Sequence, residues 1–213
     1  MILYDLPISS FGAKVRIAFA LKGVAVDSRP PPDGYGSPAY RAIVPAGTIP
    51  ALVAGDFVLS ESIAILEWIE ESYPSPSLLP GDAQARARIR QMAAFHDTGI
   101  DPPLRRLFPA PPADVAAPQV RRSLDRLGVL EGLLDAAGPF ACGPEVTLAD
   151  CGLPVTLLIA DELLARYGAA TPETPRLAAV RAAWAGHPVL GPVVATYRDV
   201  LAAWARQRFN DPA

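Results

Sequence analysis

Apolar and polar positions over residues 1–80 alternate between two spacings, one typical of buried strands and the other of helices. Ile2–Leu6 is a short apolar run that ends at Pro7, which favours a buried strand. A stripe at helical spacing follows, formed by Val15, Ala18, Phe19 and Lys22. Gly23 is expected to end this helix. Val24–Ser28 then predicts a second strand, parallel to the first because a helix connects them.

A second pair of strand signals follows a region rich in proline and glycine. Pro50–Val53 and Phe57–Leu59 flank Ala54-Gly55-Asp56, which is the pattern of a β-hairpin with Gly-Asp in its turn. Ser60 or Ser62 is expected to cap the next helix. The inward face of that helix comprises Ile65, Leu66, Ile69 and Tyr73. The predicted order is therefore β-α-β, a loop, and β-β-α.

The rest of the chain shows helical patterns only. The predicted helices cover residues 83–101, 114–137, 147–167, 174–186 and 189–208. Thr147-Leu-Ala-Asp150 is a variant capping box at the start of one of them. Residues 77–82 end a proline-rich stretch and are interpreted as a linker. We therefore predict an α/β domain over residues 1–76 and an all-α domain over residues 83–213.

The composition of the chain excludes several classes of function. The 213 residues carry a formal net charge of −3 and no basic stripe, so nucleic-acid binding is not predicted. Cys142 and Cys151 are not spaced as a redox pair, and the two histidines lack the spacing of zinc ligands. No apolar run reaches the ~18 residues of a membrane span, and the N-terminus lacks a basic, signal-like start. We expect a cytoplasmic protein without a metal or a membrane partner.

Four motifs occur in one order along the chain. Ser9 to Ala18 reads S-S-F-G-A-K-V-R-I-A and resembles the active-site segment of serine-type glutathione transferases, between the tau pattern S-P-F-G-x-R-V-R-I-A and the zeta pattern S-S-C-S-x-R-V-R-I-A. Pro45 to Leu52 resembles that family's N-P-x-G-x-V-P-x-L, and Glu61 to Ile65 its E-S-x-A-I. Gly143 to Leu153 resembles G-x-x-x-T-L-A-D-x-x-L. The chain thus resembles the cytosolic glutathione transferases over essentially its whole length.

The resemblance implies a thioredoxin-like N-terminal domain, an all-helical C-terminal domain, glutathione as co-substrate and a homodimer. Three positions depart from the family pattern. Val44 stands where Asn is frequent, and Thr48 where Lys or Gln often reaches the tripeptide. Phe11 replaces the Cys of the zeta motif, which counts against an isomerase of zeta type.

Two segments are candidates for binding the tripeptide. A cis bond between Ile49 and Pro50 would turn the Ile49 backbone outward to pair with the ligand's cysteinyl backbone, as an added strand does. Ser62 and free amides at a helix N-terminus suit a carboxylate, and Glu61 suits the γ-glutamyl ammonium. Taken alone, these segments are equally an ordinary strand start and a capped helix. The family resemblance favours the binding interpretation.

Ser9 is the candidate catalytic residue, as a hydroxyl that donates to the glutathione sulfur. A free thiol has a pKa near ~8.5, and each unit of depression needs ~1.4 kcal/mol of preferential thiolate stabilisation. A helix N-terminus and a hydrogen bond both favour the anion. Ser10 is assigned to glutathione binding and is the rival for the catalytic role. Tyr4 is expected to belong to the core.

The predicted reaction is attack of the glutathione thiolate on a small, partly apolar electrophile. The apolar wall for that substrate is expected between the domains, where Phe95, Ile100, Leu104 and Phe108 are candidates. A glutathione-dependent isomerase of zeta type, acting on a maleylacetoacetate- or maleylpyruvate-like substrate, is the first alternative. A non-catalytic glutathione-binding or scaffold protein is the second, which Val44 and Thr48 keep open.

Overall fold

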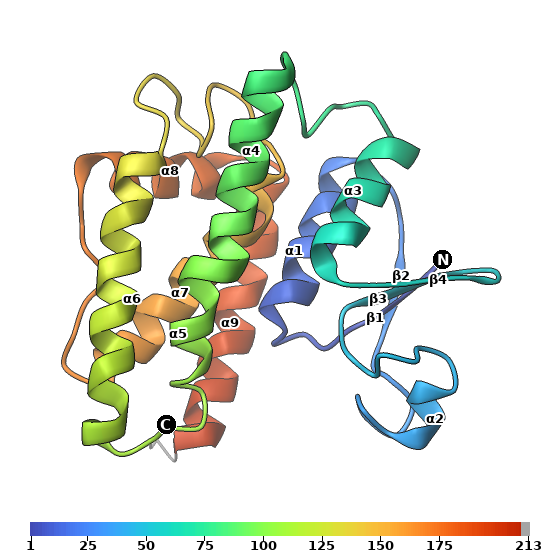
Figure 1. The fold of residues 1–213 in the computed structure, drawn as a ribbon, viewed down its shortest axis with the longest axis horizontal. Helices are drawn as coiled ribbons and strands as arrows, with labels where there is room; N and C mark the ends of the chain where they lie inside the picture. Colours follow the sequence, from blue (N-terminus) through green and yellow to red (C-terminus); the bar gives the residue numbers. More distant parts are fainter. Residues whose placement is uncertain (210–213) are drawn as a thin grey trace. The chain divides into compact units, whose positions relative to one another are not determined.

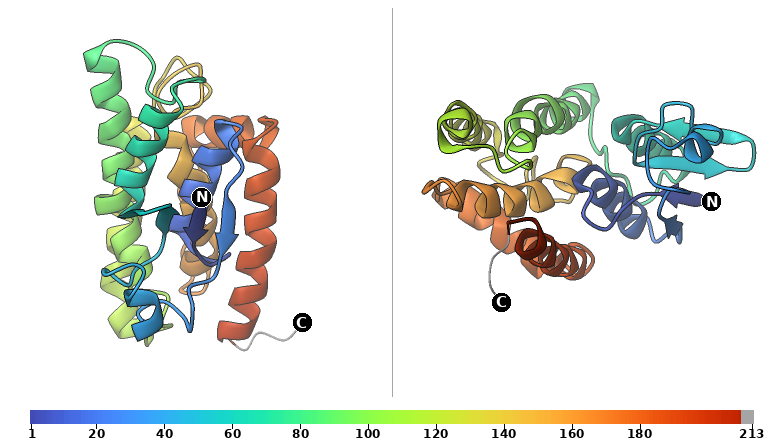
Figure 2. Two further views of the ribbon diagram at one scale, coloured as in Figure 1. Left: turned by 90° about the vertical axis from the view of Figure 1, so that its right-hand side faces the viewer. Right: turned by 90° about the horizontal axis from the view of Figure 1, so that it is seen from below.

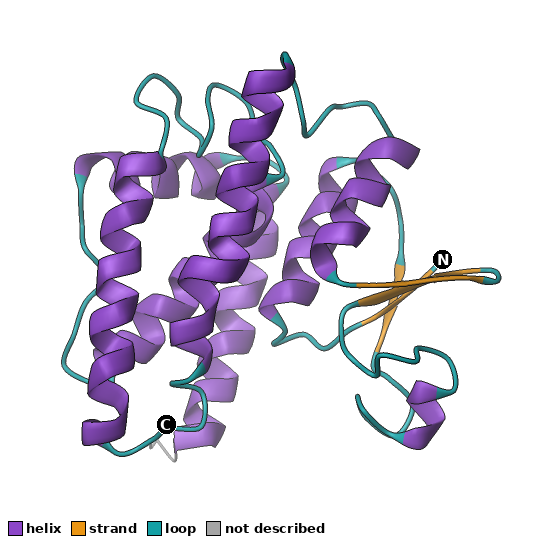
Figure 3. Ribbon diagram, in the orientation of Figure 1, coloured by secondary structure: helices purple, strands orange, loops and turns teal. Residues whose placement is uncertain are grey.

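Strands and helices divide the computed structural model into two parts (Figure 3). The structure describes residues 1–209, and the chain separates into two compact units, Met1–Leu78 and Leu79–Ala213. Every named strand of the described residues lies in the first unit. The elements of that unit are β1 (Ile2–Tyr4), α1 (Ser10–Leu21), β2 (Asp27–Arg29), α2 (Pro38–Arg41), β3 (Ala51–Ala54), β4 (Phe57–Ser60) and α3 (Ser62–Ser72).

The strands of the first unit form a sheet in the order β2-β1-β3-β4. β1 and β2 are parallel, whereas β3 runs antiparallel to both of its neighbours, β1 and β4. α1 packs against α3, and both lie on one face of the sheet, while α2 lies beyond the other face (Figures 1 and 2). This β-α-β, β-β-α arrangement confirms the predicted thioredoxin-like fold.

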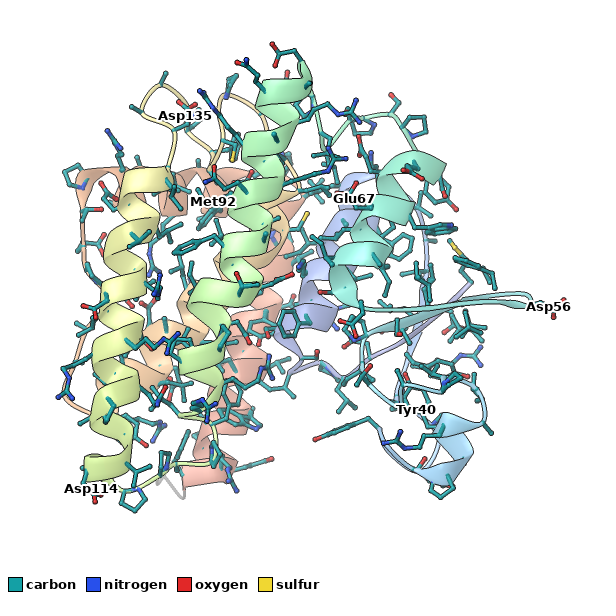
Figure 4. All side chains as sticks on the ribbon, in the orientation of Figure 1. Tyr40, Asp56, Glu67, Met92, Asp114 and Asp135 are labelled. Atoms are coloured by element: carbon teal, nitrogen blue, oxygen red, sulfur yellow. The ribbon has the colours of Figure 1, made fainter. Side chains whose placement is uncertain are left out.

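The hairpin between β3 and β4 has the turn that the sequence predicts. Gly55 has a φ of 63°, which glycine adopts without strain. Asp56 lies at the tip (Figure 4). β2 is shorter than predicted and begins at Asp27, because only its last residues pair with β1.

The predicted inward faces of α1 and α3 form the core of the first unit. Fully buried side chains come from both helices and from the sheet: Leu3, Val15, Ala18, Phe19, Leu52, Ile65, Leu66 and Ile69. Tyr4 is buried, as expected, and its ring meets that of Tyr40 edge to face at 5.4 Å. Tyr73 is only half-buried and joins a second aromatic group with Phe57 and Trp68, in which Trp68 stacks on Phe57 at 5.9 Å.

Lys22 is buried at the end of the α1 stripe and is paired rather than solvated. Its ammonium donates to Glu70 Oε2 and to the Pro76 carbonyl, each at 2.5 Å. Glu70 also accepts from the Ser77 hydroxyl at 2.7 Å and from the Leu78 amide at 2.9 Å. Burial opposes ionisation of Glu70, but these donors outweigh it and hold the pKa of its carboxyl below the ordinary value. The Lys22–Glu70 pair thus connects the end of α1 and the helix α3 to residues 76–78, where the first unit ends.

The described part of the second unit is helical. Its helices are α4 (Ala83–Phe95), a π-helix η1 (His96–Ile100), α5 (Asp101–Arg105), α6 (Ala113–Leu133), α7 (Ala149–Ala165), α8 (Pro175–Gly186) and α9 (Leu190–Phe209). No helix within residues 1–209 has both the length and the apolar character that crossing a bilayer requires. The predicted all-helical C-terminal domain is thus confirmed.

The predicted helix over residues 83–101 ends differently from expectation. It passes into the π-helix η1 and then continues as α5 to Arg105, beyond the predicted end at residue 101. Pro102 and Pro103 lie in the first turn of α5. His96, in η1, is 1% exposed and contacts the Thr156 hydroxyl through Nε2 and the Asp97 carboxylate through Nδ1, both at 2.6 Å.

Asp150 joins three segments of the second unit. Its fully buried carboxylate accepts hydrogen bonds from the Ala141 amide, the Thr147 amide and hydroxyl, and Trp184 Nε1, at 2.8–3.0 Å. Burial raises the pKa of Asp150 although these bonds oppose the shift. One of the two hydrogen bonds of the predicted capping box, from the Thr147 amide to the Asp150 carboxylate, is therefore present. Leu148 occupies the N-cap position, and the Thr147 hydroxyl donates to Asp150 instead of capping the helix.

Candidate functional site

One row of residues across the sheet places the three predicted site segments together. Tyr4, the last residue of β1, is paired with Ala51, the first residue of β3. Ala51 is in turn paired with Ser60, the last residue of β4. The chain that leaves β1 toward Ser9, the chain that enters β3 through Ile49-Pro50, and the chain that leaves β4 through Glu61 therefore all meet the sheet at the same end.

The structure distinguishes the two serines at the start of α1. Ser9 is the N-cap and is half-buried, and its Oγ accepts a hydrogen bond from the Gly12 amide at 3.0 Å. Ser10 is the first helical residue and is only 3% exposed. A hydroxyl that accepts one hydrogen bond keeps its own O–H as a donor. Ser9 can therefore cap α1 and donate to a sulfur atom at the same time.

The loop before β3 is held in place by α2. The Tyr40 hydroxyl donates to the Thr48 carbonyl at 2.8 Å, and Tyr40 itself is fully buried (Figure 4). The Ile49–Pro50 bond is cis, a point that the sequence left open. Pro50 is buried, whereas Ile49 is half-buried beside the cluster around Tyr4 and Tyr40. Sequence reasoning missed Tyr40, because nothing in the local pattern links its ring to a loop eight residues later.

Two of the three residues that depart from the family pattern, Val44 and Thr48, lie in the same loop. Val44 is 1% exposed and packs in the cluster with Tyr4 and Tyr40. Thr48 is exposed, and its carbonyl is the acceptor of the Tyr40 hydroxyl. Val44 is thus part of the core, and only Thr48 presents its side chain to solvent at this position.

The start of α3 corrects one expectation. Neither Ser60 nor Ser62 is the N-cap: Glu61 occupies that position, with φ 71° and ψ 112°, and its side chain makes no capping hydrogen bond. Ser62 is the first residue of α3 and is 7% exposed. The sequence pattern favoured serine because its hydroxyl is a good cap. In the structure, the first amides of α3 receive no cap from Glu61, and such amides suit an anion.

Two hollows lie in the second unit. One of about 610 Å³ is formed within the second unit by α7, α8 and α9, with Arg166, Arg181 and Arg198 in its lining. A smaller one of about 290 Å³ has Cys142 and Asp135 in its lining. Neither contains a predicted site residue, and pocket size alone does not identify a site. Within residues 1–209, no group of three or more His, Cys, Asp or Glu side chains is placed to hold a metal ion.

Comparisons with known proteins identify the family of this chain. Residues 3–77 match the family model described as "Glutathione S-transferase, N-terminal domain". A maleylpyruvate isomerase from Ralstonia sp is 35% identical over 167 residues, which is 72% of this chain and 79% of the relative. A glutathione S-transferase from Triticum aestivum is 38% identical over 165 residues, covering 70% and 73% of the two chains.

A solved structure extends the similarity to both units. The maleylacetoacetate isomerase of Anaeromyxobacter dehalogenans, with dicarboxyethyl glutathione and citrate bound in its active site, matches with a TM-score of 0.69 and 33% identity. The match covers 93% of this chain and 90% of that one. The order of elements, the end of the sheet where the site segments meet and these similarities lead to one conclusion: the chain belongs to the glutathione transferase family, a family of enzymes.

Proposed function

We propose that this protein binds glutathione where β1, β3 and β4 present Ser9, Ile49-Pro50 and Glu61-Ser62, and that it directs the glutathione thiolate at a small electrophile. The observation that carries the proposal is Glu61. Its backbone is held at φ 71° at the very start of α3, directly after Ser60, which lies on the row of the sheet that leads through Ala51 to Tyr4. Strained residues of this kind cluster at ligand sites.

The tripeptide has groups that suit each segment. The γ-glutamyl carboxylate suits the first amides of α3 and the Ser62 hydroxyl, and the ammonium suits the exposed Glu61 carboxylate. The cysteinyl backbone suits Ile49, next to Pro50 at the entry to β3. The sulfur then faces the N-terminus of α1. We propose Ser9 as its hydrogen-bond donor and the buried Ser10 as a binding residue of the first turn.

The chemistry requires a thiolate at neutral pH. Donation by the Ser9 hydroxyl and the positive end of α1 both favour the anion over the thiol. The thiolate then attacks an electrophilic carbon, and a C–S bond forms. The nucleophile belongs to the ligand, so Ser9 acts as donor and stabiliser. If the C–S bond persists and a leaving group or a proton completes the reaction, the result is transfer of glutathione.

Isomerisation is the second candidate and starts with the same attack. Addition of the thiolate to a conjugated cis double bond leaves a single bond that can rotate, and elimination then returns glutathione with a trans product. Curated relatives called maleylpyruvate isomerase and maleylacetoacetate isomerase favour this fate, at 35% and 43% identity over their matched regions. Phe11, in place of the cysteine of the zeta motif, favours transfer. Only transfer consumes glutathione, so quantifying glutathione after turnover separates the two candidates.

Binding comes first among the tests. Calorimetric titration with glutathione should show saturable binding, and no binding at millimolar glutathione would overturn the proposal. Binding without turnover of any electrophile, including a maleyl-type substrate, would favour the scaffold alternative. A homodimer in the cytoplasm is also proposed, and family membership is its support.

The role of Ser9 is tested by the ultraviolet absorbance of the bound thiolate as a function of pH. Ser9→Ala should raise the pKa of the bound thiol, and Ser10→Ala should raise it less. Ser123→Ala, which changes a buried serine of α6, is the matched control and should leave this pKa unchanged. If neither Ser9→Ala nor Ser10→Ala moves the thiol pKa, the catalytic assignment is wrong.

A further inference from the structure

The five residues from Asp5 to Ser9 connect the end of β1 to the start of α1 and carry the proposed donor. Few side chains in this connection are buried: Pro7 is exposed, and Leu6, Ile8 and Ser9 are half-buried. Within the connection, the Ser9 amide donates to the Leu6 carbonyl at 2.9 Å. The position of the Ser9 hydroxyl therefore depends on groups outside the connection.

Arg16 supplies such an anchor from the second turn of α1. Its Nη1 donates to Asp5 Oδ2 and to the Leu6 carbonyl at 3.5 Å, and its Nη2 donates to the Pro7 carbonyl at 3.1 Å. One guanidinium thus binds three consecutive residues of the connection. The planar fork of arginine suits several acceptors at once, whereas the lysine ammonium is a single point of charge.

Asp5 lies against the first turn of α1. Its side chain is fully buried, and a Cβ placed on Gly12 would overlap its carboxylate. Glycine at position 12 therefore allows the carboxylate to reach the N-terminal turn, where the helix dipole favours a negative charge. The amide of the same Gly12 donates to Ser9 Oγ. Asp5, Gly12, Arg16 and Ser9 form one connected group, which we call the Ser9 anchor.

We infer that Arg16 and Asp5 are positioning residues for Ser9, which hold its hydroxyl where it meets the glutathione sulfur. The inference rests on the proposed function. Neither side chain is assigned a contact with the ligand. They act through the backbone of residues 5–7 and through Gly12, so their loss displaces the donor and leaves Ile49 and Glu61-Ser62 in place. The expected defect is in thiolate stabilisation and turnover, with tripeptide affinity largely retained.

The test uses Arg16→Gln, which removes the charged fork, together with Arg16→Lys, which keeps the charge. Arg16→Gln should raise the pKa of bound glutathione thiol and lower kcat by about tenfold to a hundredfold, as expected when a reacting group is displaced. The KM for glutathione should change by less than about threefold, because the other segments are unaltered. Arg16→Lys should show the same defects to a smaller extent, and remains informative if Arg16→Gln does not fold.

Arg181→Gln is the matched control. It breaks an Arg–Asp pair in the second unit, where Arg181 binds Asp161 at 2.8 and 2.9 Å. A generic effect of losing an ion pair would appear in both variants as a lower melting temperature. Only the Arg16 variants should move the thiol pKa. An unchanged thiol pKa and kcat in Arg16→Gln and Arg16→Lys, with only stability reduced, would overturn the inference.

A double variant separates this inference from the proposed function. If Arg16 acts through Ser9, then Arg16→Gln should produce no further rise of the thiol pKa in a Ser9→Ala background. Additive shifts would show that Arg16 acts on the thiolate directly and would contradict the positioning role. If Ser9→Ala alone leaves the thiol pKa unchanged, the proposed function of Ser9 fails first. If Ser9→Ala raises it and both Arg16 variants do not, the positioning role fails alone.

Discussion

At the scale of single residues, the backbone conformation of Glu61 does not stabilise the fold. Its φ of 71° lies where a residue with a Cβ is strained by ~1–3 kcal/mol. Its side chain does not cap α3. Serine or aspartate at an N-cap stabilises a helix by ~1 kcal/mol, so Glu61 forgoes that gain as well. The proposed role in holding the ligand ammonium would account for both features.

Glu61→Gly should therefore separate stability from binding. Glycine relieves the strain at φ 71° and costs about 0.5–1 kcal/mol in entropy, so the melting temperature should stay equal or rise. Glutathione should bind at least about tenfold more weakly, because a charge-assisted contact is lost. Denaturation scans and calorimetric titration measure the two effects. Ala110→Gly, at an exposed position with φ 55°, is the control and should leave binding unchanged. Unaltered binding in Glu61→Gly would refute the role of Glu61.

Glu70 makes stability depend on pH. Its folded-state pKa lies below the ordinary 4.5, so the ionised carboxyl contributes stability above that value, and the contribution is lost as the pH falls through the lowered pKa. Glu70→Gln should lower the unfolding free energy by about 2 kcal/mol at pH 7, since the buried Lys22 loses its charged partner. The gap to wild type should narrow in urea titrations near pH 3.

Glu162→Gln serves as the comparison for Glu70→Gln. Glu162 pairs with Arg166 four residues away on the surface of α7, and such pairs contribute about 0.3–0.5 kcal/mol. The unfolding free energy of the Glu162→Gln variant should stay close to that of wild type across the same pH range. A Glu70→Gln effect of the same size at pH 3 and pH 7 would contradict the charge-based account.

At the scale of elements, the spacing of apolar residues predicted those helices and strands that bury one face. α1, α3 and the β3–β4 hairpin were predictable because one face of each is apolar and a Gly-Asp turn links the strands. The π-helix η1 was not, because residues 83–101 carry one continuous helical pattern and a π-helical turn inside a helix is rare. Glu61 at the N-cap was equally unpredictable, because the local preference for a serine cap points the other way.

The contact between η1 and α7 depends on a glycine. A Cβ at Gly152 would lie 2.8 Å from Cε1 and 2.9 Å from Nε2 of His96, whose ring is buried and hydrogen-bonded on both sides. Gly152→Ala should lower the unfolding free energy by ~1–3 kcal/mol, as overpacking of a core does. Gly128→Ala is the matched change in a helix, because nothing lies within 4 Å of a Cβ there, and it should raise stability by ~0.5–1 kcal/mol. Thermal denaturation of the pair measures both, and two changes of the same sign would contradict the contact.

At the scale of the whole molecule, the candidate site is assembled by strand register. Motifs predicted its residues, but the row Tyr4–Ala51–Ser60 that brings their segments to one end of the sheet is a property of pairing. The Ser9 anchor was missed for the same reason. Arg16 lies on a helix at a position where a solvated face is the usual outcome, and only the fold brings Asp5 beneath it.

The distribution of cysteine also concerns the whole chain. Cys142 and Cys151 are its two cysteines, and both follow residue 78. Burial, together with Asp150 and Asp135, raises the pKa of Cys142 to about 12, so its thiol is protonated at neutral pH. A Cys142→Ser, Cys151→Ala variant should therefore keep turnover within about twofold and an unchanged thiolate titration with glutathione. Lost turnover with intact glutathione binding would show that a thiol of the protein takes part.

The stack of Trp68 on Phe57 has an optical consequence. Trp68 is the single tryptophan before residue 79, and Trp184 and Trp204 lie in the second unit. Replacing the latter two by phenylalanine leaves one indole fluorophore, which lies on α3 and stacks on Phe57 of the edge strand β4. Its emission then reports on the first unit alone, so that melting of this unit is followed separately from melting of the second.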